Sequence, residues 1–158
     1  MNWQQVCEDK NLADLPYKIE LNRHGQIVMS PTRNKQGFYQ GQLAILLKKL
    51  LPHGFVLTEC AVDTSEGTFV ADAVWASVQR FAVIKDEYSC SIAPEICAEI
   101  LSWSNSKGEI ENKQAEYFQK GALEFWICDL QGQMSFFNPQ GKLGHSILCP
   151  EFPASMEV

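Results

Sequence analysis

The hydrophobic positions between residues 35 and 51 repeat with the period of a helix. Apolar side chains recur three and four residues apart, at Tyr39, Leu43, Leu46, Leu47 and Leu50. This spacing places them on one face of an α-helix. Pro52 and Gly54 follow directly, so we predict an amphipathic helix that ends there.

Shorter runs with the pattern of β-strands surround this helix. Residues 17–21 and 26–30 alternate around a turn that ends in Gly25, as in a β-hairpin. Residues 55–62 and 69–76 are rich in β-forming residues and are separated by a turn-like segment, which predicts an antiparallel pair. Residues 3–9 fit one or two helical turns, and residues 79–91 fit either a short helix or a loop.

The second half of the chain alternates between strand and helix. We predict a strand at residues 95–101, a helix at 107–120 that is capped by the serines before it and ended by Gly121, and a strand at 123–128. Such a unit places the two strands parallel and side by side. Residues 134–137 and 145–148 are expected to be edge strands. The whole pattern predicts an α/β domain with a mixed sheet, spanning residues 1–158.

The charge and cysteine content of the chain limit the kinds of function it can have. The 158 residues contain 13 Lys and Arg against 19 Asp and Glu, a net charge of -6. This balance excludes a protein that binds DNA through a broad basic surface, but it is compatible with a small acidic site that holds metal ions. The N-terminus lacks the features of a signal peptide, and no apolar run is long enough to cross a bilayer. The six scattered cysteines favour reduced thiols in a cytoplasmic protein.

Three charged residues stand where apolar residues are expected. Asp72 and Glu99 each interrupt an apolar strand, and Lys113 lies on the helix face that Ile110 and Tyr117 turn toward the sheet. A buried carboxylate must pair with a cation, bind a metal or become neutral. The alternatives are a structural ion pair or backbone hydrogen bonds for the acids, and an outward-pointing ammonium for Lys113.

Together these residues suggest phosphodiester hydrolysis. Two carboxylates on adjacent strands can hold Mg²⁺ through oxygen ligands. A lysine beside them can orient the attacking water and stabilise negative charge in the transition state. We therefore take Asp72, Glu99 and Lys113 as candidate catalytic residues.

Most of the chain resembles the PD-(D/E)XK nuclease superfamily, and specifically its Uma-type branch of restriction endonucleases. The matching stretches are residues 20–31 (ELNRHGQIVMSP), 70–74 around Asp72, and above all 94–129 (PEICAEILSWSNSKGEIENKQAEYFQKGALEFWICD). The resemblance implies a restriction-endonuclease-like fold, in which helices flank a mixed central β-sheet, with a core at about residues 17–139. It also implies an endonuclease that uses Mg²⁺ (or Mn²⁺) and acts on DNA.

The resemblance assigns roles to individual residues. Asp72 matches the aspartate of the first motif, and Glu99 matches the acid of the second strand. Leu101 stands at the usual place of the lysine, which in this branch has moved to the following helix, where Lys113 matches it. Glu20 resembles an early acid that completes the metal shell, so the implied metal ligands are Asp72, Glu99 and Glu20.

Two departures leave other functions open. Ala71 replaces a proline, and Gln36 replaces a histidine at the start of the long helix. A neutral amide cannot act as a general base, so a catalytically inactive nuclease-like fold that serves as a binding or scaffold module is the alternative. A homodimeric structural protein that uses Phe136 and Phe137 as exposed aromatics is a third hypothesis. A homodimer also suits a nuclease, because two active sites can cut both strands of a duplex.

Overall fold

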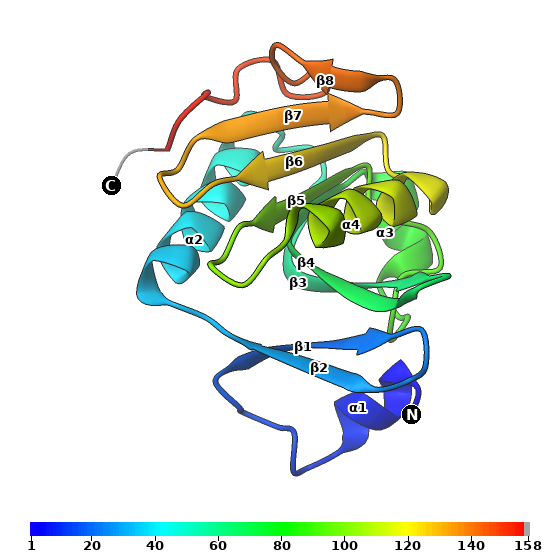
Figure 1. Ribbon diagram of the computed structural model, residues 1–158. Helices are drawn as coiled ribbons and strands as arrows, with labels where there is room; N and C mark the ends of the chain where they lie inside the picture. Colours follow the sequence, from blue (N-terminus) through cyan, green and yellow to red (C-terminus); the bar gives the residue numbers. More distant parts are fainter. Residues whose placement is uncertain (157–158) are drawn as a thin grey trace.

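The computed structural model describes residues 1–156 and contains a mixed sheet with helices on both faces (Figure 1). The strands are β1 (Tyr17–Asn22), β2 (Ile27–Pro31), β3 (Phe55–Thr64), β4 (Gly67–Ala76), β5 (Ile96–Ile100), β6 (Glu124–Cys128), β7 (Met134–Asn138) and β8 (Gly141–Leu143). The helices are α1 (Trp3–Glu8), α2 (Asn34–Leu50), α3 (Val78–Ile84) and α4 (Lys107–Gln119).

The strands lie in the order β2-β1-β4-β5-β6-β7-β8, and β3 pairs with β4 beside this path. All pairs are antiparallel except β5 and β6, which are parallel and are connected through α4. The predicted N-terminal hairpin, the antiparallel β3–β4 pair and the strand–helix–strand unit are therefore confirmed. The α/β class with a mixed sheet flanked by helices is confirmed as well.

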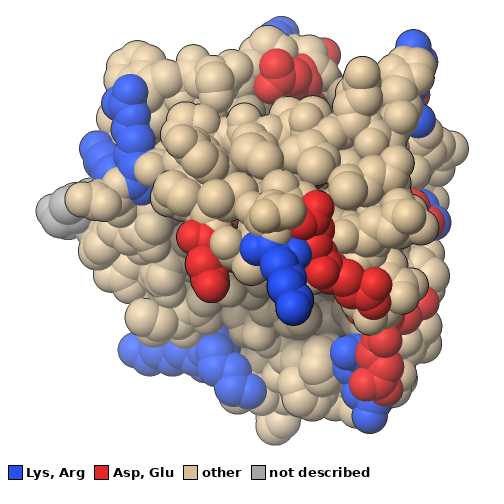
Figure 2. Space-filling view, turned by 90° about the horizontal axis from the view of Figure 1, so that it is seen from below, with Lys and Arg blue, Asp and Glu red and all other residues tan. Residues whose placement is uncertain are grey.

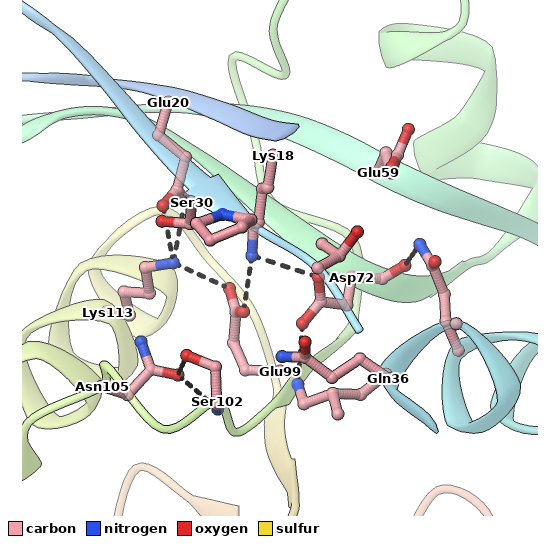
Figure 3. Close-up of a pocket in the computed structure, with 15 residues that line it drawn as sticks. Lys18, Glu20, Ser30, Gln36, Glu59, Asp72, Glu99, Ser102, Asn105 and Lys113 are labelled. Carbon is pink, nitrogen blue, oxygen red and sulfur yellow. Dashed lines mark hydrogen bonds and ion pairs between the residues drawn. The ribbon is translucent and has the colours of Figure 1, made fainter. Parts of the chain in front are cut away.

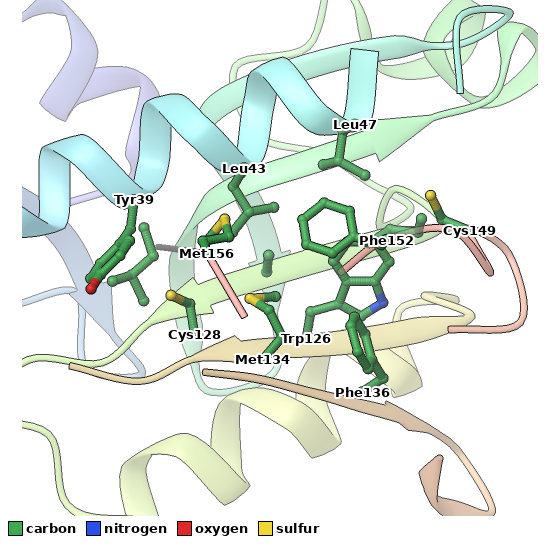
Figure 4. Close-up of a cluster of buried hydrophobic side chains, with 14 residues drawn as sticks. Tyr39, Leu43, Leu47, Trp126, Cys128, Met134, Phe136, Cys149, Phe152 and Met156 are labelled. Atoms are coloured by element: carbon green, nitrogen blue, oxygen red, sulfur yellow. The ribbon is translucent and has the colours of Figure 1, made fainter. Parts of the chain in front are cut away.

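Alternation along the central strands builds a core on each face of the sheet. On β5, Ile96, Ala98 and Ile100 face the side covered by α2. There they join a cluster that includes Tyr39, Leu43, Leu47, Trp126, Phe136 and Phe152 (Figure 4). Cys97 faces the other side, where Ile84 from α3 and Tyr117 from α4 cover the sheet. Both faces of β5 are buried, so a charged side chain on this strand needs a partner within the protein.

The prediction of a strand at residues 145–148 is wrong, because the backbone amides there bind a buried acid instead. The carboxylate of Glu124 accepts hydrogen bonds from the amides of Ile147 (2.9 Å) and Leu148 (2.8 Å) and from the hydroxyl of Ser146 (2.6 Å). The last strand is β8, which pairs with β7 and makes β7 an inner strand.

Phe136 and Phe137 do not form an exposed aromatic surface. Phe136 is 3% exposed and packs against Trp126 and Phe152, while Phe137 is partly buried against the opposite core. The hypothesis of a structural dimer built on these two rings is therefore wrong. The segment 79–91, which the sequence left open, begins within α3.

All six cysteines are free thiols, and only Cys7 is exposed. Within residues 1–156, no helix is long and apolar enough to span a membrane.

Candidate active site

The two predicted carboxylates lie side by side in the centre of the sheet. Strands β4 and β5 pair antiparallel through Ala73 and Ala98. Asp72 precedes Ala73 and Glu99 follows Ala98, so both acids sit where this pairing ends. The amide of Ile100 donates to Asp72 Oδ2 (2.7 Å), which fixes the aspartate against β5. The expectation that these residues occupy neighbouring strands is confirmed.

Helix α4 brings Lys113 and Tyr117 over Glu99. Glu99 follows Cys97 by two residues and therefore faces the α4 side of the sheet. The Tyr117 hydroxyl donates to Glu99 Oε1 (2.8 Å), and Lys113 Nζ lies 3.5 Å from the same oxygen. Lys113 is 9% exposed, so its predicted inward position is confirmed. Ser106 caps this helix by accepting from the amide of Glu109, as expected for the serine-rich loop.

Glu20 joins the cluster through Lys113. Its two carboxylate oxygens lie 3.0 and 2.8 Å from Lys113 Nζ, and one of them also accepts from the amide of Val70 (2.7 Å). The four residues predicted from the sequence therefore belong to one connected network (Figure 3).

Lys18 is an addition to the residues that the sequence predicts. Its ammonium lies 3.1 Å from Asp72 Oδ1 and 3.0 Å from Glu99 Oε2, and its side chain is 14% exposed (Figure 3). The sequence contains a signal for it, because Lys18 stands two residues before Glu20 and side chains at this spacing share one face of a strand. The lysine thus occupies the point on which the two central carboxylates converge.

Burial and the neighbouring charges shift the pKa values of the two central acids in opposite directions. Burial, followed by the negative charge of Glu99, raises the pKa of Asp72 to about 7, although Lys18 and the Ile100 amide oppose this. Burial also disfavours the charged form of Glu99, but Lys113, Lys18 and the Tyr117 hydroxyl together lower its pKa to about 2. Glu99 is therefore the permanently charged member of the pair.

The backbone is irregular beside Asp72. In the β3–β4 ladder, Thr58 pairs with Ala73 and Cys60 pairs with Ala71, and between them Glu59 adopts a positive φ of 53°. This conformation is strained for a residue other than glycine. Such strain is typical of functional sites, where the surrounding structure holds it in place.

The charged cluster lines a pocket between the hairpin, the start of α2 and the β5–α4 loop. Gln36 lines it from α2, and Ser102 and Asn105 line it from the loop. The side-chain amide of Gln36 accepts from the Arg33 amide (2.8 Å) and lies 3.4 Å from the Leu101 carbonyl. Gln36 thus faces the pocket but serves as a cap of the helix.

The carboxylate pair has donors that suit a hard cation. Asp72 Oδ1 and Glu99 Oε2 already converge on one positive group, the ammonium of Lys18. Within the described part of the chain, no three or more His, Cys, Asp or Glu side chains are grouped closely enough to hold a metal ion by themselves. Mg²⁺ commonly binds through one or two carboxylates plus substrate phosphates and water, so two converging carboxylates fit it.

Charged side chains of both signs are interspersed on the face seen in Figure 2, and that view shows no broad basic area. This face therefore offers no broad positive surface of the kind that attracts phosphates.

The mixed sheet, with two carboxylates on neighbouring central strands and lysines around them, defines a protein of restriction-endonuclease-like fold. The chain belongs to the Uma2 family, described as "Putative restriction endonuclease", whose model matches residues 9–143. A solved structure of similar fold is that of "a putative nuclease belonging to DUF820 from Anabaena variabilis ATCC 29413". It superimposes with a TM-score of 0.75 at 15% sequence identity, over 98% of this chain and 94% of that one. None of the curated proteins compared with the chain matches it.

Proposed function

We propose that the chain is a metal-dependent endonuclease that hydrolyses phosphodiester bonds in DNA. The observation that carries this proposal is the convergence of Asp72 and Glu99 on one cation, with a second lysine 3.5 Å from Glu99. Membership in the Uma2 family supports the nuclease class.

Asp72 and Glu99 are the proposed ligands of Mg²⁺ or Mn²⁺, and Glu20 is the proposed supporting ligand. The bound ion would polarise the phosphate and favour ionisation of water. Lys18 must leave the two carboxylates before an ion can replace it, and Glu20 must loosen from Lys113. The ammonium groups of Lys18 and Lys113 are then released from these carboxylates and can face a phosphate.

Lys113 is the proposed catalytic lysine. Its ammonium can orient the attacking water and stabilise the charge that develops on the phosphate oxygens. Burial keeps its side chain in place, and in the metal-free protein Glu20 and Glu99 both pair with its ammonium.

A cleavage assay tests this proposal. Supercoiled plasmid, single-stranded DNA and RNA are incubated with the wild-type protein in Mg²⁺ or Mn²⁺, with EDTA as the control. We expect metal-dependent cleavage of DNA that Asp72→Ala and Lys113→Met abolish and that Lys107→Met retains, because Lys107 is on the solvent side of α4. Equal background in wild type and Asp72→Ala would show that the chain does not catalyse this reaction.

A metal-free binding or scaffold module is the second candidate, and the Lys18 ion pairs favour it. Lys18 already forms ion pairs with both central acids, and Gln36 offers no general base. Titration calorimetry with Mn²⁺ separates the two functions. Binding that Glu99→Ala eliminates supports the nuclease, whereas no binding at millimolar metal supports the scaffold.

We further propose that a nuclease of this fold acts on duplex DNA as a homodimer, since one active site serves one strand. Analytical ultracentrifugation with and without a duplex tests this, and a strictly monomeric protein on DNA would contradict it.

A further inference from the structure

A second pocket adjoins the acidic pocket. Gln36 and Ile100 line both, so the two are immediate neighbours. Besides Leu101 and Leu130, the second pocket is lined by basic, aromatic and amide side chains, namely Arg33, Lys35, Tyr39, Trp103 and Gln131. Its composition is opposite to that of the acidic pocket, in which four carboxylates and two lysines stand together.

Trp103 and Arg33 form a flat, exposed surface at this pocket. Trp103 is 71% exposed, more than any other large hydrophobic side chain among residues 1–156. The Arg33 guanidinium lies 5.4 Å from the centre of its ring. Aromatic rings and guanidinium planes are the groups on which proteins stack unpaired nucleobases.

Tyr39 supplies an unused hydrogen-bond donor in the wall of the pocket. Its side chain is 1% exposed, and its hydroxyl is the one buried side-chain polar atom without a hydrogen-bond partner in the described part of the chain. Buried hydroxyls are normally paired. Because the hydroxyl is itself buried, a ligand oxygen or ring nitrogen can accept this bond once the pocket wall around the Tyr39 ring opens.

The basic residues of the pocket are available for a phosphate. Neither Arg33 nor Lys35 takes part in any ion pair between described residues, and the Lys35 ammonium lies over the Tyr39 ring, 5.8 Å from its centre.

We propose that this second pocket binds an unpaired nucleotide of the DNA strand whose neighbouring phosphate enters the acidic pocket. The base stacks on Trp103 and bonds to the Tyr39 hydroxyl, and Arg33 and Lys35 hold its phosphate. The substrate class is therefore DNA that presents an unpaired base, either a single strand or a duplex in which a base has opened. The direction of the strand toward Asp72 rests on the proposed nuclease function, whereas binding of the nucleotide can be measured without turnover.

The test compares Trp103→Ala with wild type in Ca²⁺, using labelled oligodeoxynucleotides of about 12 nucleotides as a single strand and as a blunt duplex. We expect the variant to bind the single strand at least about tenfold more weakly, because stacking of one base is lost, and Trp103→Phe to restore most of the affinity. Binding of the blunt duplex should change much less. Tyr88→Ala is the matched control, because Tyr88 is exposed but lines neither pocket.

Tryptophan fluorescence gives a second readout. Trp103 is the exposed member of the four tryptophans, so it dominates quenching by acrylamide. The single strand should protect it in the wild type, and no such protected signal should remain in Trp103→Phe. Unchanged affinity in Trp103→Ala, or a Trp103 that stays equally quenchable with DNA bound, would overturn the proposal.

The two proposals fail separately. If the wild type never cleaves but binds single strands through Trp103, the nucleotide pocket stands and the nuclease function falls. If the wild type cleaves and Trp103→Ala binds normally, the nuclease function stands and the nucleotide pocket falls.

Discussion

At the scale of single residues, Lys18 is the counterion of the buried pair Asp72 and Glu99. Asp72 and Glu99 are both far less exposed than ordinary surface carboxylates, and their mutual repulsion would destabilise the fold without a counterion. The ammonium of Lys18, 3.1 and 3.0 Å from the two oxygens, supplies that counterion. Under the proposed function, Lys18 and a divalent ion therefore compete for one position.

Replacing Lys18 by Met should raise the affinity for Mn²⁺ by at least about tenfold, since the ion no longer displaces a bonded ammonium. In EDTA the same variant should lose about 3 kcal/mol or more of unfolding free energy, because two buried carboxylates lose their partner. Calorimetry measures the first effect and urea unfolding the second. Lys107→Met, which removes a 91% exposed ammonium, should change neither. Weaker Mn²⁺ binding by Lys18→Met would contradict this competition.

The raised pKa of Asp72 predicts a pH dependence of the metal-free protein. In the folded chain Asp72 keeps its proton up to about pH 7. In the unfolded chain the aspartate loses this proton near its usual pKa of 3.8. The folded state thus binds more protons in this window, so unfolding free energy falls as the pH rises from about 4 to about 7. Glu99, with a pKa of about 2, has the opposite effect only below its usual value of 4.5.

Asp72→Asn cannot ionise and should lose this dependence. Urea unfolding in EDTA at about pH 5 and about pH 8 checks it, because the other titrating groups contribute equally to both proteins and cancel in the comparison. The same change in unfolding free energy in wild type and Asp72→Asn would contradict the prediction. It would mean that the Asp72 carboxylate is already ionised at about pH 5.

At the scale of elements, a buried acid on β6 determines the path of the chain after β8. Glu124 is 2% exposed and accepts from the indole nitrogen of Trp126 (2.9 Å) as well as from Ser146, Ile147 and Leu148. Residues 145–148 have the composition of a strand, but the amides of Ile147 and Leu148 donate to this acid instead of to a neighbouring strand. A local pattern cannot reveal an acceptor that lies more than 20 residues earlier in the sequence.

Glu124→Ala should therefore lower the unfolding free energy by about 3 kcal/mol or more, because the buried Ser146 hydroxyl and Trp126 indole nitrogen lose their acceptor together with two partly buried amides. Thermal or urea unfolding measures the loss. Glu151→Ala is the control, since Glu151 is an exposed acid of the same C-terminal region. A change below about 1 kcal/mol in Glu124→Ala would show that water replaces the carboxylate as acceptor.

At the scale of the whole molecule, the charge of -6 limits how DNA can bind. Without a divalent ion the acidic pocket repels phosphate, and only local cations such as those at the start of α2 attract it. We expect duplex and single-stranded DNA to bind weakly in EDTA, at least about tenfold more tightly in Ca²⁺, and less tightly as salt rises. Fluorescence anisotropy over a salt series tests this. Tight binding in EDTA would contradict it.

The sequence by itself determined helices α1, α2 and α4, the hairpin, the parallel β5–β6 unit and the candidates Asp72, Glu99 and Lys113, because periodicity and a charge inside an apolar run are local signals. Only the tertiary structure decided that Lys18 lies between Asp72 and Glu99, that Glu20 holds Lys113, and that Trp103 stands beside Arg33. Each of these pairs joins segments far apart in the chain. Which cation meets which acid depends on the order of the strands, and that order follows from packing two cores on opposite faces of one sheet.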